Sequence, residues 1–355
     1  MGGEGILLNK EDFLMRKLAS IQEIMSFDSI PGADRIELAR VMGWSAVVKK
    51  GEFSVGDKVV YFEVDSYLPM HECYAFLEKS SYRKNAFMET EGYRIKTQRL
   101  RGCLSQGLIM PLSIDSRLEG LEVGTDVTEL LGVRKWEMPE IQGGGGVSIG
   151  SKPYGIPTTD ELRVQSYDKF RSDLVGKPYY ITTKMDGTSM TVYYKDGDIG
   201  VCGRNENYKE TVDNSYWNCA KLYDLPKKLA EHKLNIAIQG EFCGAGIQKN
   251  RLKLATPKFF VFDIVDLNTN QYLGLKGIQD YVSLLGLDMV PLEEVGENFN
   301  YSLEELLEKA RGKYPSGLDK EGIVVRPVVP EYHRFYQRRL SFKVLNNDFL
   351  LKDKD

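Results

Sequence analysis

Residues 178–188, PYYITTKMDGT, place a lysine at the end of an apolar, strand-like run and follow it with an Asp-Gly pair. Asp-Gly favours a turn, so Lys184 is predicted to stand at the mouth of a pocket where the strand ends. By itself the K-x-D-G pattern is weak, because so short a motif also arises by chance. Its meaning depends on the rest of the chain.

The sequence after this turn predicts an α+β domain built on antiparallel sheet. Residues 189–204, SMTVYYKDGDIGVCGR, alternate apolar and polar positions around a hairpin turn at residues 195–198. Residues 216–232, YWNCAKLYDLPKKLAEH, have helical periodicity. The segments KFFVFDIVDL, SLEELLEKARGK and EGIVVRP continue the mixture of strands and helices.

Three carboxylates occupy positions from which they can face one cleft. Asp186 lies in the turn, Glu241 lies in the strand-like segment IQGEFCG, and Glu321 begins EGIVVRP. Mg²⁺ keeps most of its waters and is held by a few carboxylates and substrate phosphates. The set therefore suits Mg²⁺ or Mn²⁺, bound directly or through water, although each carboxylate alone is equally well explained as a surface charge.

A lysine that attacks phosphorus must first lose its proton. Its ordinary pKa is about 10.4, so it needs a desolvated pocket or neighbouring cations. Arg204 in CGRN and Lys343 in SFKV are the candidate neighbours. Phe262, on an apolar strand, can stack on a purine, although core packing explains that residue alone at least as well.

The order of these segments carries more weight than any one of them. K-x-D-G is followed by Gly-Arg, G-E-F-x-G, F-D-I, E-G-I-V-V-R and S-F-K. This series resembles the nucleotidyltransferase superfamily of ATP-dependent ligases and capping enzymes, with an ATP-grasp-like ligase domain. The resemblance implies ATP as a substrate and a lysine-AMP intermediate.

The resemblance also implies roles for individual residues. Lys184 matches the lysine that becomes adenylylated, and Asp186 matches an acidic residue near the metal or ribose. The other matches are a phosphate-binding arginine (Arg204), the two sheet glutamates (Glu241 and Glu321), a base-stacking aromatic (Phe262) and a phosphate-facing lysine (Lys343).

Two details qualify this assignment. Many family members end with K-x-K, whereas Ser341 and Leu345 stand two positions from Lys343, so the role of Lys343 in that motif stays open. Upstream, TTDELRVQ resembles a segment of several RNA ligases in which an arginine helps hold nucleotide or phosphate. This implies that role for Arg163, with a surface helix charge as the alternative.

A second module precedes this domain. Residues 18–131 form short β-rich segments between turns, which predicts a small barrel, and the glycine run in QGGGGVSIGSKPY favours a linker. We therefore expect a barrel module at 1–140, a linker at 141–157 and the catalytic domain at 158–355. The segment IPGADRIELARVMGWSAVVKKGEFSVGDKVVYFEVDSYLP resembles the N-terminal OB module of the fifth RNA ligase family.

The expected partner is RNA, or a nicked duplex containing RNA. The chain is slightly acidic, with 47 Lys and Arg against 51 Asp and Glu, so a polyanion must meet a local basic patch. The densest basic stretch of the module is YRIKTQRLR, and a solvated strand face is the alternative interpretation. Its candidate RNA-binding residues are Arg94, Lys96, Arg99 and Arg101.

Together these features predict an ATP-dependent RNA ligase that joins a 3'-OH, on an RNA strand, to a 5'-phosphate. An mRNA guanylyltransferase or a DNA ligase is the nearest alternative, but those enzymes place an OB domain after the catalytic one, and this sequence ends soon after Lys343. A non-catalytic RNA-binding scaffold is disfavoured because the lysine and both glutamates are present.

The remaining sequence features indicate the cellular compartment and the absence of a zinc site or membrane segment. The five cysteines lack C-x-x-C spacing, which suits reduced thiols in a cytosolic or nuclear compartment. No histidine pair has zinc-ligand spacing. No run of eighteen apolar residues occurs, so we expect a soluble intracellular protein without a membrane segment, and a monomer.

Overall fold

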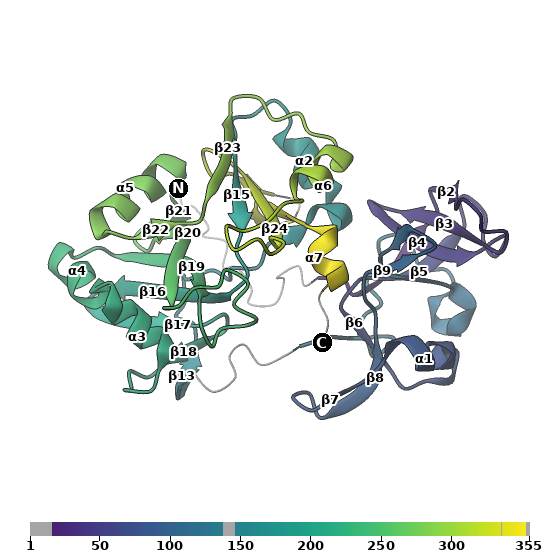
Figure 1. The fold of residues 1–355 in the computed structure, drawn as a ribbon, viewed down its shortest axis with the longest axis horizontal. Coiled ribbons are helices and arrows are strands. Elements are labelled where there is room, and N and C mark those ends of the chain that lie inside the picture. The colour runs from purple at the N-terminus through teal and green to yellow at the C-terminus, as the bar shows by residue number, and fades with distance from the viewer. Residues whose placement is uncertain (1–15, 138–145, 335, 353–355) are drawn as a thin grey trace, which may run out of the picture.

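The structure is a computed structural model that describes residues 16–137, 146–334 and 336–352. Figure 1 shows an N-terminal module beside a larger domain, with the C-terminal helix α7 (Asn347–Lys352) at the seam between them. None of the helices in the described ranges is both long and apolar enough to span a membrane. The five cysteines are free thiols.

The N-terminal module consists of small antiparallel sheets. They follow the orders β1-β5-β11, β2-β3-β4, β12-β6-β8-β7 and β9-β10. The strands are β1 (Ala19–Glu23), β2 (Ser26–Ser29), β3 (Ile36–Val41), β4 (Trp44–Lys49), β5 (Lys58–Phe62), β6 (Ser66–Pro69), β7 (Tyr82–Asn85), β8 (Thr90–Arg94), β9 (Gln98–Leu100), β10 (Cys103–Ser105), β11 (Leu108–Pro111) and β12 (Arg134–Lys135). The short helices are η1 (Glu72–Leu77), α1 (Glu78–Ser81), η2 (Leu112–Ile114) and η3 (Ser116–Leu118).

The strands of this module bury apolar side chains in two cores. In β4 the inward positions are Trp44, Ala46 and Val48, as an alternating strand requires. β5 is buried on both faces, since Val60 and Phe62 join one core while Val59 and Tyr61 join another. The predicted β-barrel module is confirmed.

The larger domain packs two sheets against each other. The longer sheet contains β13 (Ser148–Ser151), β16 (Thr188–Lys195), β17 (Asp198–Cys202), β18 (Glu206–Tyr208), β19 (Ile236–Cys243), β20 (Lys258–Asp266), β21 (Gln271–Tyr272) and β22 (Asp288–Met289). The shorter sheet has the order β14-β27-β24-β15-β23, with β14 (Leu162–Arg163), β15 (Tyr179–Lys184), β23 (Leu292–Gly296), β24 (Gly322–Pro327) and β27 (Phe342–Leu345). β25 (Tyr332–His333) and β26 (Arg338–Arg339) form a separate ladder.

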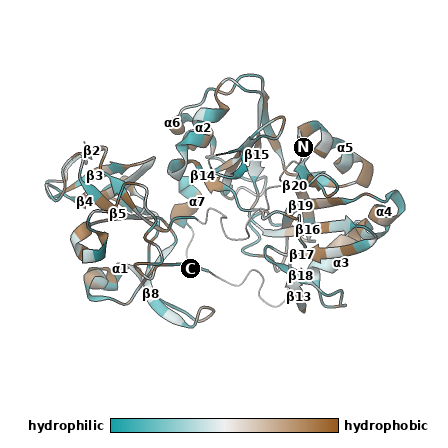
Figure 2. Ribbon diagram, turned by 180° about the vertical axis from the view of Figure 1, so that it is seen from behind, coloured by the Kyte–Doolittle hydropathy of each residue, from teal (hydrophilic) through white to brown (hydrophobic). Residues whose placement is uncertain are grey.

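Helices cover the outer faces of these sheets. They are η4 (Val164–Ser166), α2 (Asp168–Leu174), α3 (Ser215–Leu222), α4 (Leu225–His232), α5 (Leu275–Leu285) and α6 (Leu303–Lys309). Figure 2 shows hydrophobic stretches in the central strands of the longer sheet, where Val192, Ile238 and Phe259 are fully buried against α3 and α4. The domain is α+β, as predicted.

The helix predicted over residues 216–232 was wrong in one respect. The segment forms two helices, α3 and α4, because Asp224 takes a left-handed conformation between them. Pro226 lies in the first turn of α4, where its missing N–H costs nothing but where it cannot continue the preceding helix. The predicted hairpin at 195–198 is confirmed, with Lys195 opposite Asp198.

The proposed linker, 141–157, lies partly outside the described residues, which omit 138–145. Within it, β13 pairs with β18 at the edge of the longer sheet. The boundaries of the three segments stay a prediction.

Candidate active site

The K-x-D-G segment joins the two sheets of the larger domain. β15 of the shorter sheet ends at Lys184, and β16 of the longer sheet begins at Thr188. Gly187 is required there by space, because a Cβ would lie 2.4 Å from the Phe242 carbonyl oxygen and 2.6 Å from Cys243 Sγ. Lys184 and Asp186 therefore enter the cleft from a turn that is packed tightly against β19.

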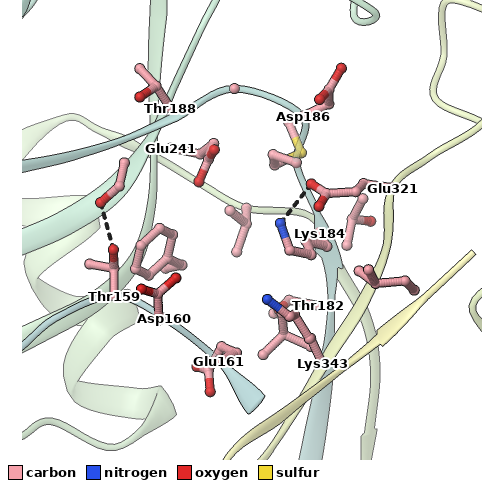
Figure 3. A pocket seen from close by; sticks show the side chains of 18 of the residues that line it. Thr159, Asp160, Glu161, Thr182, Lys184, Asp186, Thr188, Glu241, Glu321 and Lys343 are labelled. Atoms are coloured by element: carbon pink, nitrogen blue, oxygen red, sulfur yellow. Dashed lines mark hydrogen bonds and ion pairs between the residues drawn. The ribbon is translucent and has the colours of Figure 1, made fainter. Parts of the chain in front are cut away.

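The Lys184 ammonium is paired with Glu321 (Figure 3), with Nζ and Oε2 2.6 Å apart. The pairing follows from the sheet, because Lys184 is in register with Gly322 of β24. Burial favours the neutral amine, but Glu321 and then Glu241 outweigh it and raise the pKa of Lys184. The carboxylates therefore dominate this pKa, and the effect of the neighbouring cations Arg204 and Lys343 at the moment of attack stays a prediction.

Glu241 extends from β19 toward the same space. Burial is the main cause that raises its pKa to about 8, and repulsion from Glu321 and Asp186 adds to the effect. Asp186 forms an ion pair with Arg251, with 3.1 Å between Oδ2 and Nε. The three carboxylates thus exceed the two cations that pair with them, Lys184 and Arg251, which is a setting that favours a further bound cation.

The donor set fits a hydrated metal ion. Among the described residues, no three His, Cys, Asp or Glu side chains lie close enough together to hold a metal ion directly. Asp186, Glu241 and Glu321 nevertheless line one cavity of about 420 Å³. Carboxylates that share one cavity suit a cation such as Mg²⁺, which retains waters and also binds substrate phosphates.

Cationic side chains also line the cavity. Lys343 of β27 is in register with Arg163 of the parallel strand β14. Burial and repulsion from Lys184 lower the pKa of Lys343 to about 7. Arg163 donates to Asp65, but its Nε and Nη1 are buried without a partner among the described residues. Buried N–H groups in this state are suited to receive phosphate oxygens.

The remaining predicted pocket residues also reach the cavity. Arg204 donates from Nε to Asp160 at 3.2 Å. Burial of Asp160 raises its pKa, but Arg204 and Lys343 outweigh this effect and lower the pKa to about 2. Phe262 lines the cavity, and the Arg326 guanidinium lies 5.8 Å from the centre of its ring. Every residue predicted for catalysis or nucleotide binding therefore lines one cavity.

Sequence reasoning missed several lining residues. Asp160, Glu161 and Arg326 lie inside segments that were recognised, TTDELRVQ and EGIVVRP, so their position could have suggested them. Arg16, Asp65 and Lys135 carry no motif, and they reach the cavity only because the N-terminal module packs beside it.

The structure separates the four residues of the predicted RNA-binding stretch. Arg94 is largely buried, pairs with Asp65 at 3.2 Å and lies 5.0 Å from the centre of the Trp136 ring. Lys96 is half-buried, whereas Arg99 and Arg101 are exposed on the β9–β10 hairpin. None of the four lines the cavity. Arg99 and Arg101 are the members of this stretch best placed to meet a ligand at the surface.

Comparison with protein families finds two matches. A model described as an OB-fold domain matches residues 18–112, and a model described as RNA ligase matches residues 177–345. These are the N-terminal module and the sheets that build the cavity. No curated protein sequence matches.

Solved structures of a Naegleria gruberi RNA ligase are similar over almost the whole chain. A glutamate mutant of that ligase with ATP and Mn is 37% identical with a TM-score of 0.88, covering 96% of this chain and 100% of that one. The same ligase with PPi is 37% identical with a TM-score of 0.86, covering 95% and 98%. An aspartate mutant of that ligase without ligand is 37% identical with a TM-score of 0.87, covering 94% of this chain and 97% of that one.

Proposed function

This chain belongs to the RNA ligase family, and we propose that it seals RNA ends through an AMP group carried on Lys184. It is an ATP-dependent RNA ligase, in keeping with its family and its similarity to a ligase solved with ATP and Mn. One observation carries the assignment of the site. Lys184 faces, in one cavity, the carboxylates of Glu241 and Glu321 and the cations Arg163 and Lys343.

In the first step the Lys184 amine attacks the α-phosphorus of ATP. The new bond joins Nζ to phosphorus, the bond from phosphorus to the bridging oxygen breaks, and pyrophosphate leaves. Arg163, Arg204 and Lys343 hold the phosphates, and Phe262 stacks on the adenine. Positioning and charge neutralisation of this kind account for most catalysis of phosphoryl transfer.

Lys184 must surrender its proton before this attack. Glu321 holds the amine as an ammonium and so orients the nucleophile. The proton then passes to the Glu321 carboxylate or to water, which leaves the neutral amine that attacks. Asp186, Glu241 and Glu321 would hold Mg²⁺ or Mn²⁺ through water. The metal would add positive charge, which favours the neutral amine and offsets charge on the phosphates.

Two further displacements complete the reaction. AMP passes from Lys184 to the 5'-phosphate of an RNA end, and a 3'-hydroxyl then attacks that phosphate and expels AMP. We propose, from the resemblance to the fifth RNA ligase family, that the substrate is a nick or junction whose 3'-hydroxyl strand is RNA. A 2'-hydroxyl is what physically permits this discrimination. We further propose that the protein acts as a monomer.

The test is incubation with α-labelled ATP, and separately α-labelled GTP, with a divalent metal. Wild-type protein should retain label from ATP on a denaturing gel, and Lys184→Ala should not. Label from GTP alone would assign the protein to the capping enzymes, and no label from either would favour an RNA-binding scaffold. Nicked duplexes with RNA or DNA 3'-ends then test the strand preference.

A further inference from the structure

The Tyr314 hydroxyl connects the backbones of the nucleophile and its carboxylate partner. It donates to the Lys184 carbonyl oxygen at 2.7 Å and accepts from the Glu321 N–H at 3.0 Å. The side chain is 4% exposed and packs in a small cluster with Met185, Cys243 and Val290. Tyr314 does not itself line the cavity, so it acts on the site only through the residues that it contacts, and its two hydrogen bonds reach Lys184 and Glu321.

The Tyr314 hydroxyl lies at the end of the ladder between β15 and β24. Lys184 and Gly322 form the last pair of the β15–β24 ladder, and Glu321 stands just outside it. Gly322 has a φ of 151°, and a Cβ there would lie 2.1 Å from the Val344 carbonyl oxygen, so glycine is required at the end of this ladder. Tyr314 thus adds a link at the point where the Lys184 and Glu321 side chains leave the sheet.

We propose that Tyr314 is a positioning residue for the attack of Lys184 on ATP. It holds the two strand ends at the spacing that keeps Nζ beside Glu321 and directed into the cavity. This inference rests on the proposed function, since it concerns the first step of that reaction. The nucleotide contacts of Phe262 and Arg163 are separate from this link, and so is the final sealing step, in which Lys184 is not the nucleophile.

Tyr314→Phe removes both hydrogen bonds and keeps the ring. A small displacement of a nucleophile costs up to about 100-fold in rate. We therefore expect AMP transfer to Lys184 at saturating ATP to slow by about 10-fold to 100-fold, with little change in the KM for ATP. The matched control is Tyr193→Phe, which loses a hydrogen bond from Asn207 at 3.1 Å in the same domain but does not touch the site.

The experiment uses the full chain, first freed of bound AMP with pyrophosphate. Formation of labelled enzyme is followed across ATP concentrations, and sealing of a nicked RNA duplex that already carries AMP on its 5'-phosphate is followed without ATP. Tyr314→Phe should form labelled enzyme slowly, because that step needs Lys184 as the nucleophile. Its rate of sealing the AMP-carrying duplex should stay within about 2-fold of the wild-type rate, because that step does not. Tyr193→Phe should behave as wild type in both.

Equal losses in both assays would show that Tyr314 acts on the fold or on Glu321 rather than on the attack of Lys184, and unchanged AMP transfer would show that the link is dispensable. Either result overturns the inference while leaving the proposed function intact. If the wild-type protein itself takes no label from ATP, the proposed function fails, and this inference fails with it.

Discussion

Arg163 of the catalytic domain and Asp65 of the N-terminal module form an ion pair across the interface, with Nη2 and Oδ2 3.0 Å apart. Arg94 approaches the other Asp65 oxygen at 3.2 Å, and Arg16 lies 3.7 Å away. The Arg163 side chain is 6% exposed and faces the cavity. A barrel residue therefore fixes the position of a cation that we assign to ATP.

Asp65→Asn is expected to destabilise the protein at neutral pH. Burial opposes ionisation, but Arg163 and Arg16 lower the pKa of Asp65 to about 2 in the folded protein. Against an unfolded pKa of about 3.9, this corresponds to between about 2 and 3 kcal/mol. A depressed carboxyl pKa stabilises above the unfolded value, and the contribution is lost as pH falls from about 4 to about 2.

Urea unfolding of wild type and Asp65→Asn at pH 7, 5 and 3 tests this. The difference in unfolding free energy should be largest at pH 7 and 5 and smaller at pH 3. Asp28→Asn is the control, because its pair with Arg40 is exposed and should contribute little. Equal stability of Asp65→Asn and wild type at pH 7 would contradict the prediction.

The candidate catalytic residues could be located from the sequence because each lies in a short local pattern. Lys184 ends an apolar strand before Asp-Gly, and Glu321 begins another, so both patterns are visible within a few residues. The pairing of β15 with β24 then brings Lys184 and Glu321 together. Sequence order and strand character were sufficient to place these side chains in one cavity.

The contributions of the N-terminal module could not be predicted in this way. Asp65 and Arg163 are 98 positions apart, and their pairing depends on how two separately folded units pack. Tyr314 was missed for a related reason, because its hydroxyl acts on backbone atoms and no motif marks it. The state of Lys184 also needed coordinates, since the pKa is decided by the 2.6 Å contact with Glu321.

Phe262→Ala should weaken ATP binding. Stacking of a base on an aromatic side chain contributes about 1–3 kcal/mol by alanine substitution. The KM for ATP in lysine labelling should therefore rise by about 5-fold to 150-fold, while the rate at saturating ATP changes less. Phe262→Tyr keeps the ring and should stay close to wild type. An unchanged KM in Phe262→Ala would mean that this ring only packs the domain.

ATP binding should take up a proton through Lys343 at pH 8. Without ATP, burial and Lys184 lower the pKa of Lys343 to about 7, so the amine is largely neutral at pH 8. Phosphates favour its charged form, so affinity should fall as pH rises above 7. Calorimetry with an ATP analogue that has a methylene between the α- and β-phosphorus, in buffers of different ionisation enthalpy, measures this uptake.

Lys343→Arg is the matched variant for this measurement. Its guanidinium stays charged throughout the range, so proton uptake should disappear and the pH dependence of affinity should flatten. Comparison with wild type also cancels the protonation of the nucleotide itself. Equal uptake in both proteins would assign the proton to another group.

Arg99→Ala combined with Arg101→Ala should weaken RNA binding without affecting AMP transfer. Both side chains are exposed on the β9–β10 hairpin and do not line the cavity. Each lost phosphate contact lowers the slope of log affinity against log salt by about 0.7 to 0.9, so the double variant should lose about 1.4 to 1.8. Fluorescence anisotropy with a nicked RNA duplex, measured between about 50 and 200 mM salt, gives this slope. As a control, Lys49→Ala combined with Lys50→Ala removes two exposed charges of the same module. An equal change of slope in this control would show that the effect depends only on the net charge of the protein.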